Sequence, residues 1–171
     1  KVPMTFEQVK EAFGATTRTQ KVRDVDTGEL KEKVIAGEIR SEEVKQFMVK
    51  EEWYFDKQSS TMNVRVIGIC PIQEFFREGD ANQEDVQRRQ VFWIYYPEAR
   101  KILANQEVFM RQNDSDRRTW DDIFLKRMFS SYIYKENNVF DRRIEDYKQG
   151  MDALIEADRI KNEITNMEHD L

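Results

Sequence analysis

Reactive side chains are scarce in this sequence. Its 171 residues include one cysteine, Cys70, and one histidine, His169. A single cysteine excludes a disulfide within the chain, and one cysteine with one histidine is too few for a standard zinc site. A nucleophilic enzyme would have to use His169 as its base, close to the C-terminal end, where neither a pocket nor an orienting partner is expected. We therefore expect an inert, buried Cys70, a surface His169 and no enzyme.

An excess of one charge is also lacking. The 28 lysines and arginines stand against 33 aspartates and glutamates, which leaves a net charge of −5. Such a surface has no broad positive field, so we do not expect a nucleic-acid partner. Pairs of arginines do occur, but acids lie nearby and directly precede two of the three pairs, which favours solvated faces or local ion pairs over phosphate contacts. These pairs are Arg88-Arg89, Arg117-Arg118 and Arg142-Arg143.

Signatures of bound cofactors and metals are missing as well. The six glycines are scattered, and none forms a phosphate-binding loop. The segment that starts at Asp80 resembles a calcium loop at first, but it has Asp85 where glycine is needed and Val91 where glutamate is needed. Asp114-Ser115-Asp116 departs from the calcium pattern sooner. Carboxylates are so abundant that a glycosidase-like pair stays open, yet no particular pair stands out. We assign no catalytic, metal or cofactor residue.

Long apolar runs are absent too. No stretch is long and apolar enough to span a bilayer, so we expect no direct membrane insertion. No signal peptide is visible. The chain begins at Lys1-Val2-Pro3 without a methionine, which we interpret as the start of a processed or trimmed piece.

The first 45 residues read as a helix followed by a polar hairpin. Thr5 can cap a helix that runs to Phe13, and Gly14 can end it. Val22–Val25 and Leu30–Ile35 flank a turn signal around Gly28, and Ser41–Val44 could form a short helical turn. We therefore predict an N-terminal extension over residues 1–45 and an α+β core domain over residues 46–171.

The strongest strand signal follows. Glu51 interrupts a period-2 apolar pattern, and we predict a bulge or a sheet edge there. Met62–Cys70 returns as a second strand, which Pro71 should end. Gly68 leaves room for a bulky neighbour such as Trp53 or Phe55. The alternating apolar residues are Phe47, Val49, Trp53 and Phe55.

Two further segments complete the predicted sheet. Phe76–Arg89 is polar and reads as a surface loop, whereas Val91–Tyr96 reads as a third strand. Its aromatic residues could form a stacking platform, but strand periodicity favours core packing, and any outward-facing members would be interface anchors. Pro97 suits the first turn of a helix over Glu98–Ala104. The aromatic set is Trp53, Phe55, Phe92, Trp93, Tyr95 and Tyr96.

The C-terminal part reads as helical. Thr119 should cap a helix, and Ser131–Tyr134 looks like a short strand. From Arg143 to the end we predict one long helix, weakened by Gly150. Its apolar residues fall on two offset stripes, so it could pack on its own domain with one stripe and on a neighbour with the other. The first stripe comprises Ile144, Tyr147, Met151, Leu154 and Ile155; the second comprises Ile160, Ile164, Met167 and Leu171.

These segments predict an α+β fold. β-branched and aromatic residues carry the apolar content, and leucine is scarce. We expect a small, mainly antiparallel sheet from Gln46 to Gln73 and Val91 to Tyr96, with Tyr132 to Lys135 as a candidate addition. The helices at Thr119 and after Asp141, including the long C-terminal helix, should pack against this sheet.

Several segments, in order, resemble the GldN/PorN family of gliding motility and type IX secretion proteins. None is a catalytic signature, but their number and order from about residue 46 to the end make the resemblance specific. The matching segments are residues 50–57 (KEEWYFDK), 62–71 (MNVRVIGICP), 91–100 (VFWIYYPEAR), 120–124 (WDDIF), 126–129 (KRMF), 131–142 (SYIYKENNVFDR), 152–154 (DAL) and 168–171 (EHDL).

The resemblance implies an exported, periplasmic structural protein on the inner face of the outer membrane. It implies a ring built with an outer-membrane lipoprotein, GldK or PorK, with several copies of this chain in the ring. It also implies binding to the periplasmic domain of the inner-membrane-anchored GldM or PorM. Two rivals stay open: a soluble periplasmic adaptor or chaperone for exported clients, and a glycan hydrolase. The hydrolase requires a cleft with facing carboxylates and a raised pKa.

Overall fold

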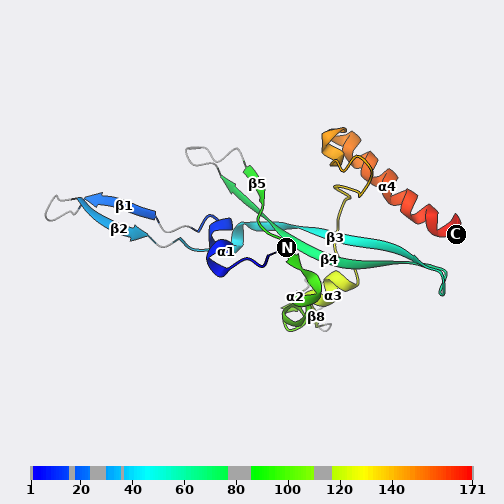
Figure 1. The fold of residues 1–171 in the computed structure, drawn as a ribbon, viewed down its shortest axis with the longest axis horizontal. Coiled ribbons are helices and arrows are strands. Elements are labelled where there is room, and N and C mark those ends of the chain that lie inside the picture. Colours follow the sequence, from blue (N-terminus) through cyan, green and yellow to red (C-terminus); the bar gives the residue numbers. More distant parts are fainter. Residues whose placement is uncertain are drawn as a thin grey trace. The chain divides into compact units, whose positions relative to one another are not determined.

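The computed structural model describes residues 2–15, 18–23, 30–35, 37–76, 86–109 and 117–170 (Figure 1). The chain forms two compact units. Unit 1 comprises Lys1–Lys50 and Ile67–Pro97, and unit 2 comprises Glu51–Val66 and Glu98–Leu171. The predicted α+β class is confirmed, because antiparallel strands and helices both occur. The predicted boundary between residues 45 and 46 stays a prediction.

Unit 1 begins with the predicted helix, α1 (Phe6–Ala12). The Thr5 hydroxyl accepts a hydrogen bond from the Gln8 amide, and the Gln8 side chain accepts one from the Thr5 amide, at 2.9 Å. This reciprocal capping box fixes the start of the helix. Gly14, with a φ of +73°, ends it. Both sequence predictions for this helix are therefore confirmed.

The predicted N-terminal hairpin is present as β1 (Arg18–Arg23) and β2 (Leu30–Ile35). The two strands are antiparallel, with registers from Arg18 opposite Ile35 to Arg23 opposite Leu30. Val25 and the predicted turn at residues 26–29 lie outside the described residues. The predicted helical turn is the 3-10 helix η1 (Ser41–Glu43), which leads directly into the next strand.

The main sheet has the strand order β3 (Val44–Asp56), β4 (Thr61–Phe76), β5 (Val86–Gln90), and β6 (Ile94–Tyr95) also pairs with β4. Figure 1 shows β3 and β4 as long neighbouring strands. The turn between them is held by Asp56, whose carboxylate accepts hydrogen bonds from the Gln58 amide and the Ser59 hydroxyl, both at 2.9 Å. The sequence predicted that the second strand returns beside the first.

Strand β4 corrects two predictions. Pro71 does not end the strand, because it lies between the β6 pairing at Gly68–Ile69 and the β5 pairing that starts at Ile72. Its missing N–H is not required there, and its carbonyl accepts the Val91 amide at 3.1 Å. The predicted loop over residues 76–89 is also wrong at its end, where β5 pairs with β4.

The predicted third strand is shorter than expected. Only Ile94 and Tyr95 pair, and α2 (Tyr96–Leu103) already begins at Tyr96 rather than at Glu98. Pro97 takes an early helical position, which needs no N–H donor. Gly68 does make room for a bulky neighbour, but the neighbour is Trp93: an added Cβ would lie 3.3 Å from its ring and 3.2 Å from the Ile94 carbonyl oxygen.

The core of unit 1 lies along the middle of β4. Cys70 is fully buried, and Ile69 and Tyr96 are buried as well. Phe13, at the end of α1, packs edge-on against Phe92 with ring centroids 5.7 Å apart. Burial of these side chains ties α1 to the sheet within this unit.

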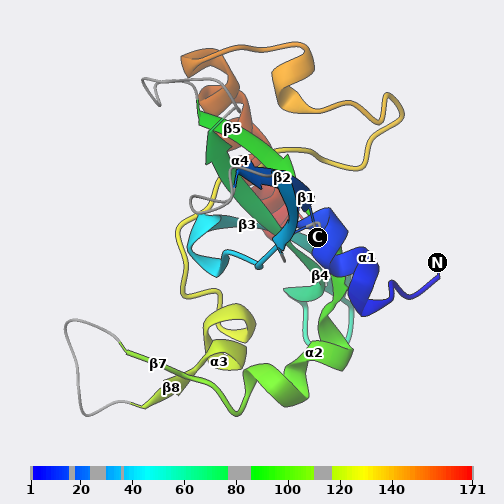
Figure 2. The same cartoon turned by 90° about the vertical axis from the view of Figure 1, so that its left-hand side faces the viewer.

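Unit 2 contains a second strand pair, β7 (Glu107–Val108) and β8 (Arg118–Thr119), followed by α3 (Trp120–Leu125) (Figure 2). Thr119 caps α3 as predicted, through a capping box with Asp122. Arg100 of α2 forms a bidentate ion pair with Asp121, with both N···O distances at 3.0 Å. This pair fixes α2 against the start of α3.

The C-terminal region corrects two predictions. Residues 131–135 form no strand, and a 3-10 helix, η2 (Ile144–Asp146), precedes the long helix. The long helix, α4, spans Met151–Asp170 and not Arg143 to the end, because Gly150 adopts a φ of +58° just before it. Within the described residues, no helix is long and apolar enough to cross a membrane.

Helix α4 packs on a small apolar core. Ile144, Ala157 and Ile160 are buried there, with partly buried neighbours around them. The inward stripe therefore differs from the predicted first stripe, since Met151, Leu154 and Ile155 are exposed. The partly buried neighbours are Ile133, Tyr147, Ala153 and Ile164.

Candidate protein-binding surfaces

Helix α3 ends with an arginine in an unfavourable conformation. Arg127 has a φ of +51°. The Arg127 amide donates to the Phe124 carbonyl at 3.3 Å, and the Met128 amide donates to the Ile123 carbonyl at 2.9 Å. These are the two hydrogen bonds of a Schellman motif, in which the left-handed position usually holds glycine. An arginine at this position therefore indicates that its side chain makes a contact that offsets the strain.

That contact is a bidentate ion pair with Glu51 of β3. The Arg127 Nε and Nη2 atoms lie 2.8 and 3.1 Å from the two carboxylate oxygens of Glu51. The Trp53 indole also donates to Glu51, at 3.2 Å. The Arg127 guanidinium lies 4.8 Å from the centre of the Trp53 ring and 5.8 Å from that of Phe129. Charge, hydrogen bonding and cation–π attraction thus converge on one side chain.

This arginine–aromatic cluster (Glu51, Trp53, Phe124, Arg127 and Phe129) explains the break in the β3 pattern. The sheet-edge alternative predicted for Glu51 is confirmed, because β3 is an edge strand of the main sheet. Its carboxylate accepts a hydrogen bond from the Trp53 indole and binds Arg127. The sequence held one sign of this arrangement, a glutamate in an apolar register, but it did not identify the partner. The cluster gives unit 2 a rigid surface on which Trp53 is partly exposed.

Unit 1 also presents an aromatic ridge (Trp93, Ile94 and Tyr95). All three side chains are exposed, although the sequence predicted a packed strand here. The prediction of core packing is confirmed for Tyr96 and wrong for Trp53, Trp93 and Tyr95. Strand periodicity cannot tell which face of a sheet is covered, and that is why these residues were misplaced. Exposed aromatic residues are the usual anchors of protein interfaces.

Helix α4 carries an outer apolar stripe (Met151, Leu154 and Ile155). These positions are spaced i, i+3, i+4 and lie on one face of the helix. The opposite, inward face holds Ala157 and Ile160. The predicted first stripe is therefore wrong in its membership. Its members Ile144 and Tyr147 pack in the same core as Ile160 and Ile164 of the predicted second stripe.

An ordered loop tip follows. The Asn138 side chain accepts hydrogen bonds from the amides of Phe140 and Asp141, both at 3.1 Å. Lys135 and Asp141 form an ion pair at 2.7 Å, which lowers the pKa of Asp141. The tip nevertheless presents Val139 and Phe140 to solvent, 98% and 71% exposed. The loop is held by polar contacts while its apolar side chains have no cover.

The predicted chemical sites have the following positions. Cys70 is fully buried, as predicted, and burial raises the pKa of its thiol, which disfavours the reactive thiolate. The side chain of His169 lies outside the described residues, as do residues 80–85 and 114–116 of the two rejected calcium loops. In the part of the chain that the structure describes, no three histidine, cysteine or acidic side chains gather as a metal site.

Four described carboxyl groups have shifted pKa values, and all four are lowered: Asp56, Asp122, Asp141 and Glu156. Hydrogen bonds from backbone, hydroxyl or basic groups stabilise their ionised forms. A glycosidase acid requires the opposite shift. None of these four is therefore arranged as such an acid.

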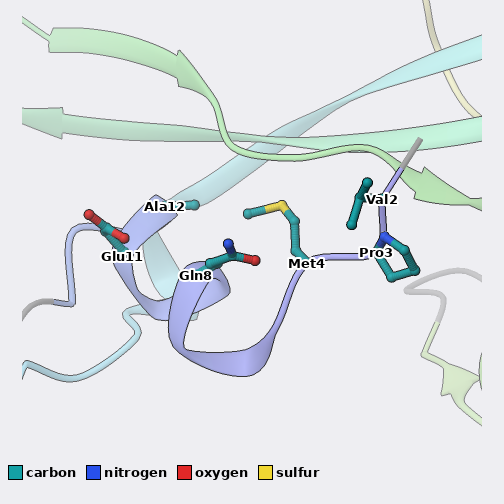
Figure 3. A pocket seen from close by; sticks show the side chains of 6 residues that line it. All are labelled: Val2, Pro3, Met4, Gln8, Glu11 and Ala12. Atoms are coloured by element: carbon teal, nitrogen blue, oxygen red, sulfur yellow. The ribbon is translucent and has the colours of Figure 1, made fainter.

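A hollow of about 420 Å³ lies beside α1, lined by Val2, Pro3, Met4, Gln8, Glu11 and Ala12. Figure 3 shows these side chains, all of which come from α1 and the segment before it. Glu11 is the one titratable group among them. The hollow thus lacks the facing carboxylates that a hydrolase needs.

The arginine pairs make local contacts. Arg88 pairs with Glu74 at 3.0 Å, and Arg117 pairs with Glu107 at 3.7 Å, as predicted. Arg89 donates to the buried Gln73 at 2.7 Å. In the third pair, both guanidinium groups lie over aromatic rings: Arg142 over Phe140 and Tyr147, and Arg143 over Tyr134.

Comparison with known proteins identifies the family of the chain. A family profile described as gliding motility associated protein GldN matches residues 1–171. No curated protein matches the chain. The profile covers the whole chain, including the first 45 residues, to which the motif resemblance did not extend. The chain belongs to the GldN family of gliding motility associated proteins.

Proposed function

We propose that this protein is a structural and adaptor subunit of the type IX secretion and gliding machinery. In this proposal it lies in the periplasm, beneath the outer membrane, and forms a ring with a GldK- or PorK-like lipoprotein. It also contacts the periplasmic domain of a GldM- or PorM-like protein. Its role is to bind and transmit force, with no reaction performed.

The observation that carries the proposal is the amount of apolar surface left uncovered. Among the described residues, eight apolar residues are buried, whereas 24 large hydrophobic residues are exposed. Scattered exposed hydrophobics are ordinary, but ordered groups such as the aromatic ridge and the outer stripe of α4 mark binding sites. A chain with several separate apolar surfaces suits a subunit that touches several neighbours.

Co-purification from cells tests the proposal. Affinity isolation of the full chain should recover the lipoprotein, and electron microscopy of the isolate should show rings. Tyr95→Ser in the aromatic ridge and Ile155→Ser in the outer stripe should each reduce the recovered rings, because they remove exposed anchors without touching the core. Lys101→Ser on α2 is the matched control, since it changes an exposed polar residue.

Two outcomes would contradict the proposal. One is full-sized lipoprotein rings in cells that lack this protein. The other is an isolate that contains only single copies of the chain with assorted exported proteins bound, which is the result that the chaperone alternative predicts.

A further inference from the structure

We propose that the loop tip at Val139–Phe140 of one copy docks into an apolar hollow beside α4 of the next copy. This inference rests on the proposed function and names the contact that would join neighbouring copies. We call the tip, with Arg142, the knob, and the hollow the socket. Both belong to unit 2.

The knob is ordered before it binds anything. Two backbone amides are held by Asn138, and the ion pair between Lys135 and Asp141 closes the loop. The Arg142 guanidinium lies 4.9 Å from the centre of the Phe140 ring and 4.4 Å from that of Tyr147. Binding would therefore cost little ordering entropy, which is the property of a preformed anchor.

The socket has a size and lining that suit such an anchor. Its volume is about 370 Å³, and it lies between the extended segment before the knob and the first turns of α4. Its lining is mostly apolar, with one acid. The lining includes Tyr132, Ile133, Glu145, Gly150, Ala153 and Leu154.

Charge identifies the occupant as a second copy. The knob pairs an aromatic ring with the positive Arg142, and the socket pairs apolar walls with the negative Glu145. The knob does not fill the socket of its own chain, because Val139 is 98% exposed and Phe140 is 71% exposed. Apolar and charged parts of one surface therefore match those of the other.

The geometry of such a contact is head-to-tail. The knob and the socket are different surfaces, so each copy keeps one free knob or one free socket after a single contact. Contacts of this kind propagate from copy to copy and close into a ring when the rotation permits. A symmetric dimer contact, by contrast, would use both surfaces at once and stop.

Cysteine cross-linking in cells tests the inference in the intact assembly. The native Cys70 is buried and should not interfere. The double variant Val139→Cys/Leu154→Cys should give a ladder of covalent multimers on oxidation. Each single variant alone should stay uncross-linked, and co-expression of the two singles should give dimers and no larger species, because only one cysteine junction can form per pair.

Two further variants test whether the ladder depends on the knob itself, and not on any exposed phenylalanine or on the stability of the fold. Adding Phe140→Ser to the double variant should reduce the ladder about tenfold or more, because it removes the aromatic anchor. Adding Phe109→Ser, which changes another highly exposed phenylalanine of unit 2, should leave the ladder unchanged. Thermal unfolding of both variants should match the parent, since neither side chain is buried.

The inference is overturned if no ladder forms. It is also overturned if Val139→Cys alone gives dimers, because that would mean that two knobs contact each other. Recovery of the lipoprotein is measured on the same samples. If the lipoprotein co-purifies and no ladder forms, the knob and socket are wrong while the ring proposal stands. If the lipoprotein does not co-purify with the parent chain, the proposed function itself fails.

Discussion

Helices α1 and α3 lie in different units but have the same design. Each is a short helix that begins with a threonine capping box and ends with a Schellman motif. They differ at two positions. The third helical residue is the neutral Gln8 in α1 and the ionisable Asp122 in α3, and the left-handed residue is Gly14 in α1 and Arg127 in α3.

The difference shows two ways to hold the left-handed residue at a helix end: by a backbone that is free of strain, or by the contacts of a side chain. At the end of α1, glycine adopts the left-handed conformation without strain, so no side-chain contact is needed to offset a backbone cost. At the end of α3, the ion pair between Arg127 and Glu51 offsets the energetic cost of the strained Arg127 backbone. The second design couples the helix end to β3, so that α3 and the strand are held as one surface.

The largest expected effect comes from removing that side chain. Arg127→Ala should lower the free energy of unfolding by about 2–3 kcal/mol, because it leaves Glu51 unpaired and keeps the backbone strain. The Glu51 side chain is 14% exposed and that of Arg127 is 34% exposed, so the pair is partly screened and stays below the range for a buried pair. Arg127→Gly should be milder by about 1 kcal/mol, because glycine relieves the strain. Chemical denaturation measures both.

The order of the two variants is the decisive result. If glycine at position 127 were as harmful as alanine, or worse, the left-handed backbone would carry no cost, and the comparison between the two helix ends would fail. Lys126→Ala is the matched control, because it changes a neighbouring cation that is more exposed and that pairs with Asp122 on the same helix. It should change stability far less.

Much of the fold could be predicted from local rules. Thr5, Thr119 and Gly14 have the helix-boundary chemistry that their positions suggest, and the alternation in β3 gave the first long strand. Errors arose where pairing decides the structure. Pro71 continues a strand because it falls between the segments of β4 that pair with β6 and with β5. Gly150 is a separate case: it has a positive φ, and the helix begins only after it. Neither fact is visible without the neighbouring segments.

The binding surfaces were less predictable. Glu51 interrupted an apolar pattern, but its partner lies 76 residues away in sequence, and no spacing rule connects them. Asn138 is a frequent turn residue, yet nothing in the sequence shows that the turn leaves Phe140 uncovered. Exposure depends on what the rest of the chain fails to cover, and residue type does not encode it.

A smaller effect is expected at the glycine end of α1. Gly14→Ala should lower the free energy of unfolding by about 1–2 kcal/mol, because alanine is strained at a φ of +73° and its Cβ would lie 3.2 Å from the Arg89 Nη2 atom. Gly150→Ala is the control: its φ is also positive, but an added Cβ meets nothing within 4 Å. Equal losses in the two variants would show that the contact with Arg89 contributes nothing.

The smallest effect is the loss of a helix cap at acid pH. It is expected at α3, where Asp122 can be protonated, and not at α1, where Gln8 is neutral. Hydrogen bonds from the Thr119 backbone and hydroxyl, more than Lys126, lower the pKa of Asp122 from 3.8 to about 2. The unfolded chain therefore binds a proton at this group more readily than the folded chain does. The stabilisation by the ionised cap is complete above about pH 4 and is lost as the pH falls towards 2. In NMR spectra, the Thr119 amide should titrate with a midpoint near pH 2, whereas the Thr5 amide, bound to the neutral Gln8, should show no transition there. A Thr119 midpoint near 4 would mean that the carboxylate cap is not formed in solution.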